Sequence, residues 1–122
     1  MKARSISDIS RLLNAKGNIS LLDKLTVYQH VSRVWRSHLT PYEIVVTGYI
    51  VDRSVGWGKN HFTAAHGNIL RGNEEYAGIG MKERTYFRTL SSLEQKGLIR
   101  RRNRRDCVTI ALDVNWQCDQ VR

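Results

Sequence analysis

The chain has 122 residues, enough for one compact domain and too few for two ordinary ones. Its 20 Lys and Arg against 11 Asp and Glu give a formal net charge of +9, an excess that favours a polyanionic partner. No apolar run is long enough to span a bilayer or to serve as a signal-peptide core. We therefore expect a cytoplasmic protein with no membrane partner.

The N-terminal part of the chain contains two predicted helices. Ser5 or Ser7 can cap the first helix, and Gly17 can follow its last turn as a left-handed residue. Asn18 or Ser20 can open the second helix. The apolar positions of this second helix keep helical spacing and are Leu21, Leu22, Leu25, Tyr28, Val31 and Trp35. Such a stripe fits either a core or a dimer seam, and we expect this extension to form a homodimer.

Thr40-Pro41-Tyr42-Glu43 is the clearest helix start in the sequence. The Thr40 hydroxyl can accept from the backbone N–H of Glu43, and the Glu43 carboxylate can accept from the backbone N–H of Thr40. Pro41 loses no hydrogen bond at the first helical position. The helix should end near Arg53. Because several of its residues are β-branched, burial rather than intrinsic propensity must stabilise it.

A glycine-rich turn, Gly56-Trp57-Gly58-Lys59, follows this helix. A phosphate-binding loop would need glycine at position 53 and Ser or Thr at position 60, where the chain has Arg53 and Asn60. We therefore expect no nucleotide site here, and we expect Trp57 to cover the core. A short strand at 61–63, a short helix from 63 or 64 to 70, and a long loop from 72 to 80 should follow.

The last part of the chain is predicted to form a helix and a β-hairpin. The helix covers 82–96 and is closed by Gly97. Strands at 98–102 and 107–112 are joined by a turn at 103–106, and Val114 and Trp116 can pack back onto the core. The sequence thus predicts an α+β, mainly helical fold. Its parts are a helical extension (1–38), a main domain (39–116) and a tail (117–122).

Most of the positive charge lies in this last part. Residues 82–105 hold nine basic and two acidic residues, a net charge of +7. On the helix, Tyr86, Leu90 and Leu93 share one sector and should face the core. Arg84, Arg88, Ser91 and Gln95 lie opposite. Arginine, glutamine and hydroxyl groups on an exposed helix can contact base edges and phosphates in a major groove.

Five arginines crowd the predicted hairpin, where neighbouring phosphates would relieve their mutual repulsion. Arginine also enters narrow minor grooves. We therefore expect the helix and the hairpin to contact adjacent parts of one DNA duplex. The residues expected to contact DNA are Lys82, Arg84, Thr85, Arg88, Ser91, Ser92, Arg100, Arg101, Arg102, Arg104 and Arg105.

Two segments of the sequence also resemble a known family. GIGMKERTYFRTLSSLEQKGLIRRR (78–102) resembles the recognition helix and first wing strand of winged helix-turn-helix proteins. LTPYEIVVTGYIVDRSVGWGKN (39–60) resembles the N-terminal domains of phage replication protein O and related plasmid replication proteins. The resemblance implies a winged helix-turn-helix with a β-hairpin wing. It also implies sequence-specific binding of double-stranded DNA in replication or transcription control of a plasmid or phage. Lys82 stands where the family usually has a capping Ser or Thr.

The same sequence features also allow functions other than DNA binding. The basic helix face could be an ordinary solvated surface, the hairpin could bind RNA, and the N-terminal helices could dock another protein. His61 and His66 have no carboxylate or thiol that completes a metal site with them, and Cys107 has no marked His or Asp partner. We therefore expect no enzyme activity, no metal, no cofactor and no small-molecule substrate.

Overall fold

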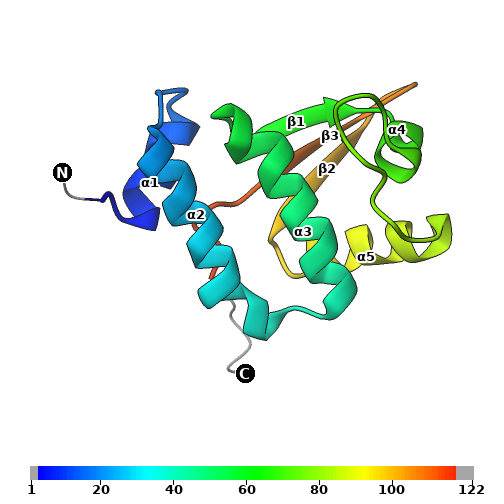
Figure 1. Ribbon diagram of the computed structural model, residues 1–122, viewed down its shortest axis with the longest axis horizontal. Coiled ribbons are helices and arrows are strands. Elements are labelled where there is room, and N and C mark those ends of the chain that lie inside the picture. The colour runs from blue at the N-terminus through cyan, green and yellow to red at the C-terminus, as the bar shows by residue number, and fades with distance from the viewer. Residues whose placement is uncertain (1–2, 118–122) are drawn as a thin grey trace.

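The computed structural model describes residues 3–117 and has an α+β, mainly helical fold with a small antiparallel sheet (Figure 1). The helices are α1 (Ile6–Asn14), α2 (Leu21–Arg33), α3 (Pro41–Ser54), α4 (His66–Arg71) and α5 (Glu83–Gln95), with short 3-10 helices η1 (Trp35–His38) and η2 (Val55–Trp57). The strands are β1 (His61–Ala64), β2 (Ile99–Asn103) and β3 (Val108–Leu112). None of the helices between residues 3 and 117 is both long and apolar enough to cross a membrane.

The first three α-helices start at positions predicted from the sequence, and each start is capped by side-chain hydrogen bonds. Ser5 caps α1, and capping boxes with Asp23 and Glu43 start α2 and α3. The prediction for the end of α1 is wrong by one residue. Lys16, with φ 58°, takes the left-handed position, and the N–H of Gly17 donates to the carbonyl of Leu12.

The sheet has the strand order β1-β3-β2, so the hairpin strand β3 lies in the centre. Its register pairs Ile110 with both Phe62 and Arg101. Val108, Ile110 and Leu112 are buried, because successive strand residues point to opposite faces and these three face the helices. The alternation predicted for this strand is therefore confirmed.

The N-terminal extension joins the main domain through two buried tryptophans. The ring centroids of Trp35 and Trp116 lie 5.6 Å apart with their planes nearly perpendicular. Each indole N–H is satisfied, because Trp35 donates to the carbonyl of Trp116 and Trp116 donates to the carbonyl of Lys96. The segment after β3 therefore packs back, as predicted, and fastens η1 to the end of α5.

Helix α2 buries less of its apolar stripe than a core helix would. Val27, which lies outside the predicted stripe, is buried, whereas Leu21 and Leu25 are 82% and 48% exposed. Asp23, in the first turn of α2, is also buried, and its carboxylate accepts a charged hydrogen bond from Arg4. The exposed part of the stripe is thus available to a partner, which leaves the dimer interpretation open.

Candidate nucleic-acid interface

Helix α5 presents its predicted polar face to solvent. Tyr86, Leu90 and Leu93 are buried against the core, and Arg84 and Arg88 are exposed on the other side. Lys82 is the N-cap but makes no side-chain capping bond, in keeping with the missing Ser or Thr. The first N–H groups of α5 are therefore open to another acceptor, such as a phosphate.

Glu43 anchors the C-terminal half of α5 to the start of α3. Besides closing its capping box, this buried carboxylate accepts from Lys96 Nζ at 2.6 Å and from the Ser92 hydroxyl. Burial acts to raise the pKa of Glu43, but the bonds from Lys96, Ser92 and the Thr40 backbone outweigh it and lower the pKa below its usual value. Ser92, predicted to contact DNA, is thus occupied inside the protein.

Arg101 joins β2 to α5. Its side chain donates to Glu94 Oε1 through Nη2 at 3.0 Å and Nε at 3.2 Å, and its backbone N–H donates to Glu94 Oε2 at 3.1 Å. Nη2 also donates to the Ser91 hydroxyl. Only 16% of the Arg101 side chain is exposed. Arg101 therefore aligns the hairpin with the helix and has little surface left for a ligand.

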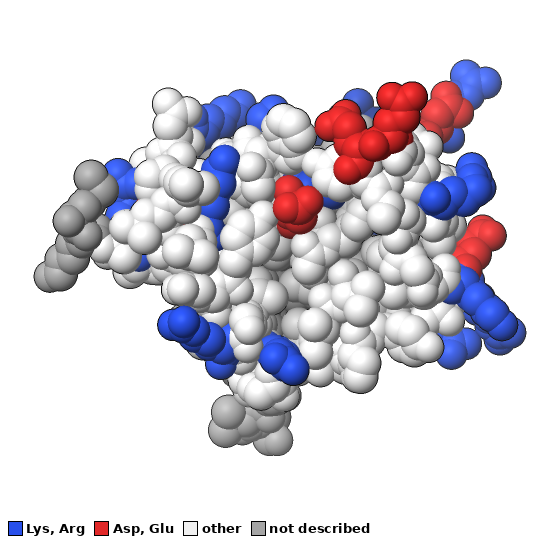
Figure 2. Space-filling view, viewed as in Figure 1, with Lys and Arg blue, Asp and Glu red and all other residues white. Residues whose placement is uncertain are grey.

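The other hairpin arginines divide into two groups. Arg100 and Arg102 pair with Ala111 and Thr109, so they lie on the face of the sheet away from Arg101 and α5. Arg104 and Arg105 are exposed in the turn between β2 and β3. That turn and the N-terminal end of α5 lie at the same end of the molecule (Figure 1). Basic side chains also gather at this end, with acidic ones among them (Figure 2).

The loop between α4 and α5 is shaped by close backbone contacts. Gly72 has φ +88°, and a Cβ there would lie 2.5 Å from the backbone N of Gly78. The side chain of Asn73 accepts from the N–H groups of Glu75 and Tyr76. Larger residues at either glycine would force this loop apart. These contacts fold the long connection between α4 and α5 back on itself.

His66, at the start of α4, packs against α5. Its Nδ1 lies 2.8 Å from the hydroxyl of Tyr86, and its ring meets Phe87 edge-on. Burial lowers the pKa of His66, and nearby Arg101 adds to this effect, whereas a hydrogen bond with Asn103 opposes it. This environment favours the neutral imidazole, which serves packing between the two helices.

The structure has a second cluster, around Trp57, that was not predicted from the sequence, and the predicted position of Trp57 is wrong. This residue does not cover the core but is 63% exposed, and its indole N–H donates to the Tyr76 hydroxyl. Trp57 and Tyr76 line a pocket together with Arg53, Lys59 and His61. The available signal was a tryptophan between two glycines, two residues before a lysine. Glycines on both sides allow a sharp turn that projects the side chain outward.

No group of three or more His, Cys, Asp or Glu side chains within residues 3–117 is arranged to hold a metal ion. Cys107 is half-buried in the turn directly before β3. Comparisons with protein-family models, curated proteins and solved structures found no match to this chain.

Proposed function

We propose that this protein binds double-stranded DNA sequence-specifically, with α5 as the recognition helix of a winged helix-turn-helix. The observation that carries the proposal is the exposed face of α5. Arg84 and Arg88 project from it and make no hydrogen bond or ion pair with the other residues of 3–117. Arg104 and Arg105 extend this basic surface at the same end of the molecule (Figure 1).

The order of elements supports the same proposal. Helix α3 is followed by β1, α4, α5 and the β2–β3 hairpin, and β1 pairs with β3. This is the order expected for a winged helix-turn-helix, in which the second helix of the motif enters the major groove and the hairpin is the wing. The family resemblance of residues 39–60 and 78–102 agrees with it.

Each part of the surface has a distinct role in this proposal. Arg84 and Arg88 contact base edges in the major groove, where arginine pairs best with guanine, and Thr85 and Ser91 assist from the same helix. Lys82 and the free N–H groups beside it bind a phosphate. Arg104 and Arg105 hold the backbone or the minor groove. By resemblance, the setting is the cytoplasm of a cell that carries a plasmid or phage, in replication or transcription control.

Fluorescence-anisotropy titrations across a salt series test the proposal. The probes are a random duplex and a duplex selected from a random pool by the protein. Arg88→Ala should cost about 1–3 kcal/mol on the selected site and much less on the random duplex. Arg104→Ala with Arg105→Ala should weaken both and flatten the salt slope by about one unit per lost phosphate contact. Arg33→Ala, an exposed arginine on α2, is the matched control and should change neither.

Two results would contradict DNA binding. One is weak, salt-insensitive association that neither variant changes. The other is a preference for structured RNA over every duplex, which would assign the same basic surface to RNA instead.

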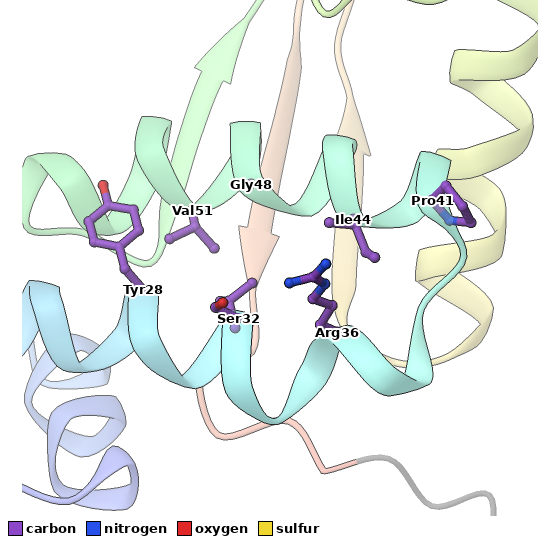
Figure 3. Close-up of a pocket in the computed structure, with 8 residues that line it drawn as sticks. Tyr28, Ser32, Arg36, Pro41, Ile44, Gly48 and Val51 are labelled. Carbon is purple, nitrogen blue, oxygen red and sulfur yellow. The ribbon is translucent and has the colours of Figure 1, made fainter.

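A second copy of this chain is the protein partner we propose for the groove between α2 and α3. A groove of about 480 Å³ separates α2 from α3, with Tyr28 and Arg36 on one side and Ile44 and Val51 on the other (Figure 3). Figure 2 shows few charged side chains over α3, with an acidic one among them. Because two copies of net charge +9 repel each other, an interface is best placed where basic side chains are few, and Arg36 is the one charged residue among those that line the groove.

Gly48 allows this homodimer to be tested without damage to the fold. It lies in α3 on the wall of the groove, and a Cβ there would meet nothing within 4 Å. Gly48→Leu should fill the groove and shift the protein to monomer in sedimentation velocity. Gly48→Ala should gain the same helix propensity, about 1 kcal/mol, and keep the dimer. A monomeric wild type at all concentrations would reject the proposal.

A further inference from the structure

Trp57 is the exposed member of the three tryptophans in this protein. Its side chain is 63% exposed, whereas Trp35 and Trp116 are 1% and 5% exposed. Trp57 is the last residue of η2, and Gly58 follows it with φ +76°. The chain therefore turns away directly after the indole, which projects from the surface. An exposed ring of this size, beside other aromatic and charged groups, is typical of a binding site.

An ordered frame of aromatic rings supports the indole. Its N–H donates to the Tyr76 hydroxyl, so its polar edge is already satisfied and its faces are left for stacking. The guanidinium carbon of Arg53 lies 4.4 Å from the centroid of the Tyr76 ring and 4.9 Å from that of Phe62. These cation–π contacts fix Tyr76 against α3. The site is therefore formed before any ligand arrives.

The pocket beside Trp57 has the size and charge for one nucleotide. Its volume is about 480 Å³, within the range of small-ligand pockets. Among its lining residues, Arg53, Lys59 and His61 are basic groups and Glu75 is the one carboxylate. A cationic or proline-rich peptide would gain little from this excess of basic groups, whereas a phosphodiester would gain directly.

We propose that this pocket binds an unpaired base of single-stranded nucleic acid. The base stacks on Trp57, and its flanking phosphates contact Lys59 and His61. Bases within a duplex are stacked on one another and offer no free face, so the ligand must be single-stranded. Because every base has a π-face, this stacking tolerates any sequence.

This pocket is separate from the proposed duplex surface. His61 pairs with Ala111, whereas Ala64, at the other end of β1, pairs with Val108 next to the hairpin turn. Trp57 and Lys59 precede His61, and none of Arg84, Arg88, Arg104 and Arg105 is among the residues that line the pocket, which starts at the end of β1 remote from the hairpin turn. The inference therefore does not depend on duplex binding.

Tryptophan fluorescence tests the inference directly, because Trp35 and Trp116 are shielded from solvent. Oligo(dT) of about ten nucleotides, within the site sizes of single-strand binders, should quench the Trp57 emission and protect it from acrylamide. In anisotropy titrations, Trp57→Ala should weaken oligo(dT) binding about tenfold, and Trp57→Phe should retain part of the affinity. Tyr42→Ala removes an aromatic side chain of similar exposure, 57%, on α3 and should change nothing.

Lys59→Ala tests the phosphate contact and should lower the salt slope for oligo(dT) by about 0.7. Thermal melts of all variants show whether they fold. Equal binding of oligo(dT) to wild type and Trp57→Ala, or no binding at all, would overturn the inference. So would protection of Trp57 by a proline-rich peptide but not by oligo(dT). Duplex affinity is measured on the same variants and should not change, so the two proposals fail independently.

Discussion

Two sets of basic side chains on and around α5 differ in what they contact. Lys96 and Arg101 each donate to a carboxylate that holds elements together, Glu43 on α3 and Glu94 on α5. Arg84 and Arg88 are exposed and make no such contact with the described residues. Net charge alone therefore overstates the binding surface, because part of it stabilises the fold. The predictions below test whether the two sets are as distinct as their contacts indicate.

The largest effect is expected at Glu43. Glu43→Ala leaves Lys96, the Ser92 hydroxyl and the Thr40 N–H without their acceptor. Removing one member of a buried pair costs about 3–5 kcal/mol, and we expect the lower end because Lys96 is 34% exposed and can reach water. Urea unfolding should show a loss of about 3 kcal/mol in the free energy of unfolding.

Glu83→Ala is the matched control for this change. Glu83 is an exposed carboxylate in the first turn of α5, so its loss should cost under about 1 kcal/mol. Duplex affinity of folded Glu43→Ala should equal that of wild type. Equal stability of the two variants would show that the Glu43 network contributes nothing to the fold.

Acid should destabilise the protein by protonating two buried carboxylates, Glu43 and Asp23. The pKa of Glu43 is lowered, as described above. The pKa of Asp23 is also lowered, because hydrogen bonds from Ser20 and Arg4 outweigh the effect of burial. A carboxyl group with a lowered folded-state pKa contributes its full stability above its unfolded pKa, here 4.5 for Glu43 and 3.8 for Asp23. That stability is lost as the pH falls through the folded pKa. Thermal melts should therefore shift down below about pH 4.5, and Glu43→Gln should flatten this dependence.

Arg101 and Arg102 are adjacent in sequence, but their replacement by alanine should affect the stability of the protein differently. Arg101→Ala removes the bonds to Glu94 and should lower stability by about 1–2 kcal/mol. Arg102 is exposed on the outer face of the sheet, so Arg102→Ala should leave stability within about 0.5 kcal/mol. Equal losses in chemical unfolding would contradict the assignment of these side chains to opposite faces.

Local signals in the sequence predicted the elements well. The capping box of Thr40 and Glu43 fixes the start of α3 by bonds between residues three apart, and both appear in the structure. The two predicted strands do form a hairpin, but the turn lies one residue later than predicted, at 104–107, because Asn103 is the last residue of β2 and pairs with Val108. Helical spacing, however, shows only that a stripe exists. It could not show that Leu21 and Leu25 stay exposed while Asp23 is buried, because that depends on where α1 and the N-terminal segment pack.

The position of the candidate site could be predicted from the sequence. Which of its residues are exposed and which make contacts within the protein could not. The exposed face of α5 follows from its periodicity, as expected. Which hairpin arginine faces the helix depends on strand register, and a shift of one residue would exchange Arg101 with Arg100 or Arg102. The contacts of Ser92 with Glu43, and of Trp57 with Tyr76, join residues far apart in sequence. No local pattern encodes such pairs.

Lys82 combines the two roles that separate the basic residues around α5. It is the N-cap of the helix, and it is also a proposed phosphate contact. Lys82→Ser supplies the missing capping oxygen and should stabilise the protein by about 0.5–1 kcal/mol, whereas Lys82→Ala should not. Both changes remove one positive charge and should reduce the salt slope for duplex DNA by about 0.9. If Lys82→Ser raises stability while both variants lose the same affinity, capping and DNA binding are separable at this residue. If the alanine variant keeps wild-type affinity while the serine variant binds more weakly, the open N–H groups of α5, rather than the lysine charge, hold the phosphate, because only the serine hydroxyl occupies one of them.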